Sequence, residues 1–179
     1  METFEELVEM HYEALYRFGY SLCKSPDIAS DLVQQAFCIW AEKGHQLKDK
    51  SKAKTWLFTT LYREYLRLSK KGKKFIGDDI SELEYSLPAP AVDNERLLDG
   101  KYAVYLLGTL DEIFKAPLVL FFLQQHSYKE IAEILDIPIG TVMSRISRGK
   151  ELLKTAFHSK KEGSHNKVIQ IKKIGGNNG

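Results

Sequence analysis

The chain has 179 residues, 44% of them hydrophobic, which is enough for one domain or two small ones and excludes an intrinsically disordered protein. Its formal net charge of +2 predicts no particular partner by itself. No apolar run is long enough to span a bilayer, and the first residues are acidic where a secretion signal would be basic, so we expect a cytoplasmic protein.

The chain begins with two stretches of helical periodicity. Residues 4–22 carry apolar side chains three and four positions apart, which predicts an amphipathic helix that ends before Pro26. Residues 27–43 repeat the pattern, and Gly44 is well placed to stop this second helix.

A polar segment then precedes a third helix. Residues 45–54 are rich in lysine and have no apolar period, so we expect a loop. A helix should run from Trp56 to about Lys70.

Residues 75–93 contain two prolines and several acids without a sustained period, which indicates a flexible linker between two helical domains. The sequence therefore predicts an all-α protein with one domain at residues 1–74 and a second at residues 94–155. Residues 156–179 should form a largely disordered tail, since the apolar pattern fades there.

Two local features shape the start of the second domain. The segment from Thr109 to Glu112 has the S/T-x-x-E spacing of a capping box, which predicts a helix start. Pro117 lies inside the apolar pattern that follows, so it should kink that helix or delay its start.

A helix-turn-helix pattern follows at residues 127–145. Ser127 and Glu130 have the spacing of a second capping box, and Ala132 is small where two helices must approach closely. Asp136 sits at the expected bend, where aspartate tolerates a left-handed backbone, and Pro138 suits the first turn of the next helix.

The second helix of this motif has one apolar face and one polar face. Val142, Ile146, Gly149 and Leu153 form a stripe toward the core. Arginine suits bidentate contact with guanine, and serine or threonine can contact bases or phosphates, so we expect the opposite face to read duplex DNA through Thr141, Ser144, Arg145 and Arg148. The alternative is a solvated face of an ordinary helical hairpin.

Basic and acidic blocks alternate along the chain, and the first basic block is rich in aromatic residues. Residues 43–74 and 137–179 are basic, whereas residues 1–42 and 75–136 are acidic, which suggests two phosphate-facing surfaces. Cations that follow a phosphate chain and rings that stack on unpaired bases are typical of single-stranded DNA binding. The candidates are Lys48, Lys50, Lys52, Lys54, Trp56, Tyr62, Arg63, Arg67 and Lys70.

Two plainer interpretations of these features remain open. The aromatic series could simply be core, and the charged blocks could simply solubilise the protein.

No pattern of residues indicates catalysis or a metal site. Cys23 and Cys38 lie inside helical patterns and are expected to be buried free thiols, and no histidine has a paired spacing with them. We find no nucleophile with a base, no paired carboxylates and no glycine-rich phosphate loop, so we expect neither an enzyme nor a cofactor.

Three segments together resemble a known family. Residues 31–37 (DLVQQAF), residues 56–59 (WLFT) and residues 127–148 resemble the extracytoplasmic-function sigma factors of bacterial RNA polymerase, within the sigma-70 family. Residues 4–74 look like that family's region 2, and residues 94–155 look like its region 4.

The resemblance implies partners and roles. The helix at residues 27–43 would dock on the clamp helices of the largest polymerase subunit, with Asp31, Gln34 and Gln35 on the contact face, and the flap of the second-largest subunit would be a further contact. The basic aromatic segment would capture a flipped base of the promoter's minus-ten element and hold the melted strand, while the helix-turn-helix would read the minus-thirty-five element. An anti-sigma factor is a plausible further partner.

Some positions depart from the family pattern. Arg63 and Arg67 stand where many members carry Asn and Asp, so we expect phosphate contacts there instead. Met143 replaces a common basic residue, and Asp136 replaces a common glycine. The rival interpretation is a conventional helix-turn-helix regulator whose N-terminal domain dimerises or senses a signal.

Overall fold

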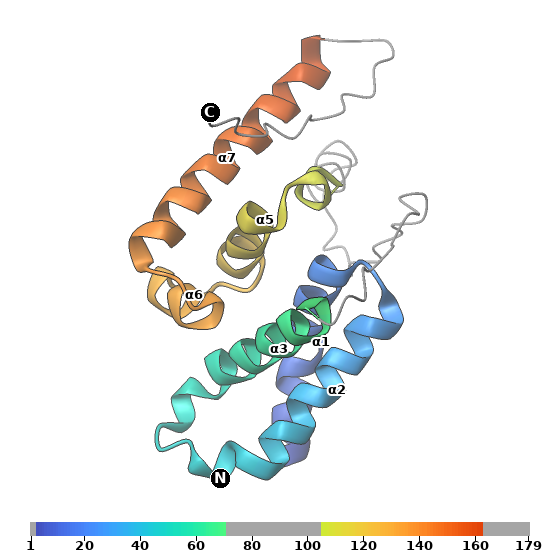
Figure 1. The fold of residues 1–179 in the computed structure, drawn as a ribbon, viewed down its shortest axis with the longest axis vertical. Coiled ribbons are helices and arrows are strands. Elements are labelled where there is room, and N and C mark those ends of the chain that lie inside the picture. Colours follow the sequence, from blue (N-terminus) through green and yellow to red (C-terminus); the bar gives the residue numbers. More distant parts are fainter. Residues whose placement is uncertain (1–2, 71–104, 163–179) are drawn as a thin grey trace.

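The computed structural model describes residues 3–70 and 105–162, with side chains up to residue 158, and within these ranges it is helical and contains no strand (Figure 1). The all-α prediction is therefore confirmed. The expected linker at residues 75–93, the expected start of the second domain at residue 94 and the tail beyond residue 162 lie outside the described residues.

Three helices form the first half of the fold: α1 (Phe4–Cys23), α2 (Pro26–Lys43) and α3 (Ala53–Lys70). Their starts follow local chemistry, since Thr3 makes a capping box with Glu6, and Ser25 caps α2 directly before a proline. The three helices pack on one another around fully buried side chains of Leu15, Phe18, Leu32, Val33, Leu57, Phe58 and Leu61. Cys23 is buried as expected, but Cys38 is exposed, because it lies on the outer side of α2.

The predicted loop between α2 and α3 contains two short 3-10 turns, η1 (Gly44–Gln46) and η2 (Lys50–Lys52). Gly44 does follow the end of α2, but its φ of −62° is right-handed, so the reason for glycine is not the backbone angle we expected. A Cβ there would lie 2.6 Å from Cδ2 of Trp40. Glycine is needed because the Trp40 ring lies directly on the backbone.

The second half contains α5 (Glu112–Leu118), the π-helical turn η3 (Val119–Leu123), α6 (Tyr128–Leu135) and α7 (Ile139–Glu162), preceded by helical residues 105–109. The capping box expected at Thr109 is absent, because its hydroxyl donates back to the carbonyl of Leu106 and Asp111 becomes the N-cap. Pro117 lies within α5, and the backbone changes from α to π geometry two residues later.

The helix α7 continues to Glu162. Residues 156–162, which we had placed in the disordered tail, are thus helical.

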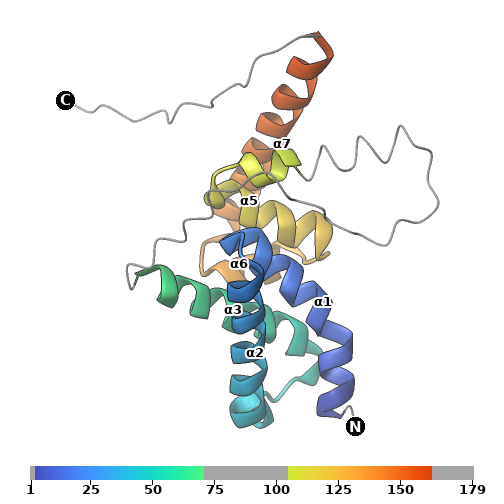
Figure 2. The same ribbon diagram turned by 90° about the vertical axis from the view of Figure 1, so that its right-hand side faces the viewer.

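The two halves pack against each other rather than standing apart. α3 lies against α6, and α1 lies against α5 and η3 (Figures 1 and 2). Buried apolar side chains from both halves belong to one continuous cluster. We call this contact the closed interface, and its polar and aromatic members are Lys54, Thr55, Phe58, Tyr65, Glu112, Gln124, His126 and Glu130.

Three side-chain hydrogen bonds cross the closed interface. The Lys54 ammonium donates to the carbonyl of Gln124 at 2.6 Å, and the Thr55 hydroxyl donates to Oε1 of Glu130 at 3.0 Å. About three helical turns along α3, the Tyr65 hydroxyl donates to Oε2 of Glu112 at 2.7 Å. Burial and this carboxylate both raise the pKa of Tyr65.

His126 is the buried polar centre of the interface. Its ring is 2% exposed and lies edge-on to Phe58, with 4.7 Å between the ring centroids. Neither ring nitrogen has a hydrogen-bond partner among the described residues, and Oε1 of Glu130 is 3.9 Å from Nδ1. Burial lowers the pKa of His126 to about 4, with the Lys54 charge adding to the shift and Glu130 opposing it.

The buried histidine predicts a loss of stability in mild acid. Between pH 6.5 and about 4 the unfolded chain binds a proton at His126 that the folded chain does not, so stability is complete above pH 6.5 and falls as the pH drops toward 4. The loss should reach about 2–3 kcal/mol of unfolding free energy. Urea unfolding at pH 7 and pH 5 measures it.

The variant His126→Phe is the control for other titrating groups. It keeps a ring against Phe58 but cannot bind a proton, so its unfolding free energy should change less between pH 7 and pH 5 than that of the parent. An equal change in both proteins would show that other groups cause the pH dependence.

Candidate nucleic-acid interface

The helix-turn-helix has the local geometry that its sequence predicts. Ser127 and Glu130 form the reciprocal capping box at the start of α6. Asp136 ends that helix in the left-handed region, with φ 53° and ψ 51°. Pro138 lies one residue before α7 rather than in its first turn, and its carbonyl accepts from the backbone N–H groups of Thr141 and Val142.

The helix α7 has the predicted two faces. Val142, Ile146 and Gly149 are buried, and Leu153 is half-buried. A Cβ on Gly149 would lie 2.6 Å from Cδ1 of Leu118, so glycine permits the close approach of α7 to α5.

The side chains expected to read duplex DNA emerge from α7 outside this buried stripe. Ser144 and Arg148 are exposed, whereas Thr141 and Arg145 are half-buried. The Ser144 hydroxyl donates to the carbonyl of Thr141 at 3.0 Å, which orients its oxygen as an acceptor. Met143 is 51% exposed, so the departure from the family pattern adds an apolar side chain near these residues.

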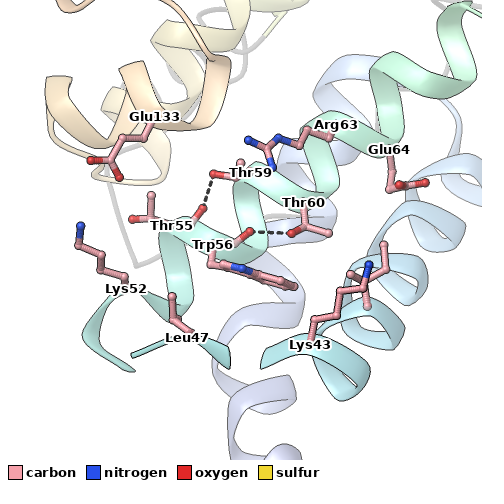
Figure 3. A pocket seen from close by; sticks show the side chains of 11 residues that line it. Lys43, Leu47, Lys52, Thr55, Trp56, Thr59, Thr60, Arg63, Glu64 and Glu133 are labelled. Carbon is pink, nitrogen blue, oxygen red and sulfur yellow. Dashed lines mark hydrogen bonds between the residues drawn. The ribbon is translucent and has the colours of Figure 1, made fainter. Parts of the chain in front are cut away.

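A cavity of about 610 Å³ lies beside the start of α3, and all but one of its lining residues belong to the first half (Figure 3). Of the predicted single-strand residues, Lys52, Trp56 and Arg63 line it. The Trp56 ring is half-buried and meets Trp40 edge-on, with 5.1 Å between the centroids. The cavity thus combines an aromatic wall with three cations, since Lys43 also lines it, and this combination suits a base and its neighbouring phosphates.

Several lining residues were not predicted from sequence. The missed residues are Ile39, Lys43, Leu47, Thr55, Thr59, Thr60, Glu64 and Glu133. The hydroxyls of Thr59 and Thr60 donate to backbone carbonyls one turn earlier in their own helix (Figure 3). Nothing in the sequence indicates that these two residues also line a cavity. Glu133 comes from α6, and only the closed interface brings it here.

The remaining loop lysines lie elsewhere. Lys48 and Lys50 are exposed but do not line the cavity. The Lys50 ammonium donates to the carbonyl of Gly44 at 2.8 Å and lies 5.6 Å from the centroid of the Trp40 ring. Lys50 therefore stabilises the turn after α2.

Other predicted residues of α3 are engaged within the protein. Lys54 is held by Gln124, and Arg67 pairs with Glu64 on its own helix. Tyr62 is half-buried and stacks on Tyr65 with 6.2 Å between the centroids.

The pKa of Tyr62 is affected by a charge on the duplex-reading face. Burial and the Glu112 charge raise its pKa, and the Arg145 charge opposes them. A charge expected to read duplex DNA therefore acts on a ring expected to contact the opened strand.

Asp31, Gln34 and Gln35 are exposed on one face of α2. The neighbouring Leu32 and Val33 are buried on the opposite side against the core. Because positions three and four apart share a helix face, the three polar residues form a surface available to a partner. Lys70 is exposed at the end of α3.

Among the described helices, none combines the length and apolar character needed to cross a bilayer. No group of three or more potential metal ligands is present in residues 3–70 and 105–162.

Two family models match the chain. Sigma-70 region 2 matches residues 7–75, which include α1 to α3 from the fourth residue of α1 onward. Sigma-70 region 4 matches residues 102–153, which include α5, α6 and most of α7.

Individual proteins match over nearly the whole chain. The ECF RNA polymerase sigma factor SigM of Bacillus subtilis is 28% identical over 162 residues, covering 87% of this chain and 96% of its own. SigW of the same organism is 27% identical and covers 86% and 88%. The sigma factor RpoE of Bartonella quintana, solved in complex with the anti-sigma factor NepR, superposes with a TM-score of 0.68 at 26% identity, over 88% of this chain and 98% of that one.

Both regions occur in this one chain, which matches named ECF sigma factors over most of its length and has the fold of a solved sigma factor. This chain therefore belongs to the sigma-70 family and is an extracytoplasmic-function sigma factor of RNA polymerase.

Proposed function

We propose that this sigma factor divides promoter recognition between its two halves, with the first half holding the opened minus-ten strand and the second half reading the minus-thirty-five duplex. The observation that carries the proposal is the cavity beside Trp56, where an aromatic wall and the cations of Lys52 and Arg63 meet in the region-2 half of the chain. A protein that binds only duplex DNA does not need a site for an unpaired base.

The cavity suits a base that has left the helical stack. Extruding a base costs a few kcal/mol, and stacking on an aromatic ring returns about 1–3 kcal/mol per base. Lys43, Lys52 and Arg63 would contact the phosphates on either side, and Lys48 and Lys70 would extend the basic track. The bond-making chemistry belongs to the polymerase.

The second half would place α7 in the major groove. Arg145 and Arg148 would contact guanines or phosphates, and Thr141 and Ser144 would contact phosphates or base edges. The exposed thioether of Met143 favours an apolar contact such as the methyl group of thymine.

Protein partners follow from the exposed surfaces and the relatives. We assign Asp31, Gln34 and Gln35 to the clamp helices of the largest polymerase subunit, and the second half to the flap of the second-largest subunit. An anti-sigma factor would hold the chain inactive, as the complex of the related RpoE suggests. The chain would then act in the cytoplasm, where the polymerase is.

Transcription with purified components tests the proposal. The chain, mixed with core polymerase and a promoter library, should start transcription at a subset of promoters that core alone does not use. The variant Asp31→Lys should reduce initiation but keep duplex binding. Duplex binding without any gain in initiation would instead favour a conventional regulator.

Arg145 should determine sequence preference at one position of the duplex element. Arg145→Ala should cost about 1–3 kcal/mol of discrimination at that base pair if the arginine makes a bidentate base contact. Competition binding with duplexes changed one base pair at a time measures this. An equal loss on every duplex would identify a phosphate contact.

Trp56 should matter for strand opening. Trp56→Ala should weaken capture of the opened strand by about 1–3 kcal/mol, because one stacking surface is lost. Permanganate reactivity of unpaired thymines in the polymerase complex measures opening.

Trp40→Ala is the matched control for this measurement. It removes the other ring of the same edge-on pair, and Trp40 does not line the cavity. Equal losses of opening and of thermal stability in both variants would assign Trp56 to the core instead.

A further inference from the structure

We propose that Ile139 and Met143 make duplex recognition by α7 depend on the methyl groups of two thymines in the minus-thirty-five element, an inference that rests on the function proposed above. Ile139 lies one helical turn before Met143, and the two side chains are 50% and 51% exposed. Both are large apolar groups that contribute little to the core. Their place on the duplex-reading helix gives them a DNA group to contact.

Two edges of different chemistry flank the buried stripe of α7. Helical positions three and four apart share a face, and this spacing defines each edge. The arginine edge carries Thr141, Arg145 and Arg148. The methionine edge begins with Ile139 and Met143 and continues through the exposed residues Ser147, Lys150 and Lys154. A helix in the major groove lies between the two DNA strands, so its two edges meet different bases.

The lysines of the methionine edge indicate which partner covers it. Lys150 and Lys154 follow Met143 by two and three helical turns, and both are exposed. Lysine is depleted at protein–protein interfaces, whereas it is a common phosphate contact in DNA complexes. Duplex DNA presents thymine methyl groups in a groove bordered by phosphates. The combination of an apolar pair with cations in line therefore fits duplex DNA better than an apolar protein surface.

Gly140 lets the start of α7 come close to the bases. It lies between the two edges, and a Cβ there would meet no described atom within 4 Å. Glycine lowers helix stability relative to alanine, so packing within the described protein gives no reason for it. Ser144, one turn later, is also small and exposed. The outward ridge of α7 is therefore low, and the side chains on its flanks can reach the base edges.

The spacing of the apolar pair matches the spacing of bases. Four residues of helix rise by about 6 Å, which is close to two base-pair steps of about 3.4 Å. The methyl group of thymine is the apolar feature that distinguishes this base in the major groove. Contact with an aliphatic side chain removes both groups from water, and the gain follows the apolar area buried. We therefore expect two thymines about two steps apart under the methionine edge.

Removal of single methyl groups from the DNA tests the inference without changing the protein. The probe is the best-used promoter of the promoter library, bound as a duplex fragment by the chain with core polymerase. Each thymine of its minus-thirty-five element is replaced in turn by deoxyuridine, which keeps the base pair and the O4 acceptor but lacks the methyl group. Binding should weaken roughly fourfold at two of these positions. If no replacement weakens binding, the inference is overturned.

Alanine variants assign each methyl group to a side chain. Met143→Ala should abolish the effect of deoxyuridine at one position, and Ile139→Ala should abolish it at the other. Leu152→Ala is the matched control, because it shortens another exposed side chain of α7, four positions after Arg148 on the arginine edge, and should keep both effects. Equal methyl dependence in the parent and in both alanine variants of the methionine edge would contradict the proposal.

Met143→Arg provides a second readout, because it restores the basic residue that the family pattern predicts. It should remove the methyl dependence at one thymine. It should also steepen the fall of affinity with salt, raising the log–log slope by about 1, because one more phosphate is neutralised. Methyl dependence that survives in this variant at both thymines would overturn the assignment of Met143.

Failure of the proposed function gives a different pattern. If the chain with core polymerase uses no promoter of the library, the proposed division of promoter recognition is wrong, and the inference is wrong with it. If promoters are used but Ile139→Ala and Met143→Ala weaken only the binding of the chain to core polymerase, the methionine edge contacts the polymerase. The proposed function then stands, and the inference is overturned.

Discussion

The carboxylate of Glu130 couples the local fold of the helix-turn-helix to the packing of the two halves. Its Oε2 accepts from the backbone and hydroxyl of Ser127 and so caps α6, while its Oε1 accepts from Thr55 on α3. Burial acts to raise the pKa of Glu130, but the bonds from Ser127 and Thr55 outweigh it and lower the pKa. The ionised carboxylate is therefore the form that the closed structure favours.

The sequence predicts what depends on neighbours within a few positions. The end of the first helix before Pro26, the bend at Asp136 and the buried stripe of α7 follow from the restraints of proline, tolerated backbone angles and helical spacing, and all are present. Predictions from neighbouring residues also fail where the side chain makes a different hydrogen bond within the same turn. Thr109 had the spacing of a capping residue, but its hydroxyl bonds the carbonyl of Leu106 instead.

The site is harder to predict because its parts are distant in sequence. Thr55 and Glu130 are 75 positions apart, and no periodicity within either helix indicates that they meet. Glu133 is an exposed acid on an amphipathic helix by pattern, and its place at the cavity depends on α6 lying against α3. Glycine is needed at position 44 because of where the indole ring of Trp40 lies. Rules about helix ends do not take the position of such a ring into account.

The two arginines that depart from the family pattern have different surroundings. Arg67 forms two hydrogen bonds with Glu64 on its own helix, at 2.9 and 2.5 Å, so its charge is largely compensated. Arg63 is exposed and lines the cavity. Of the two substitutions, only Arg63 adds a cation to the proposed path of the strand.

The closed interface and DNA binding respond differently to salt. The contact of His126 with Phe58 and the shared apolar cluster depend little on ionic strength, whereas the proposed strand binding should weaken steeply with salt because each neutralised phosphate releases counterions. A rise in salt concentration should therefore weaken the proposed DNA binding and leave the apolar packing of the two halves largely unchanged.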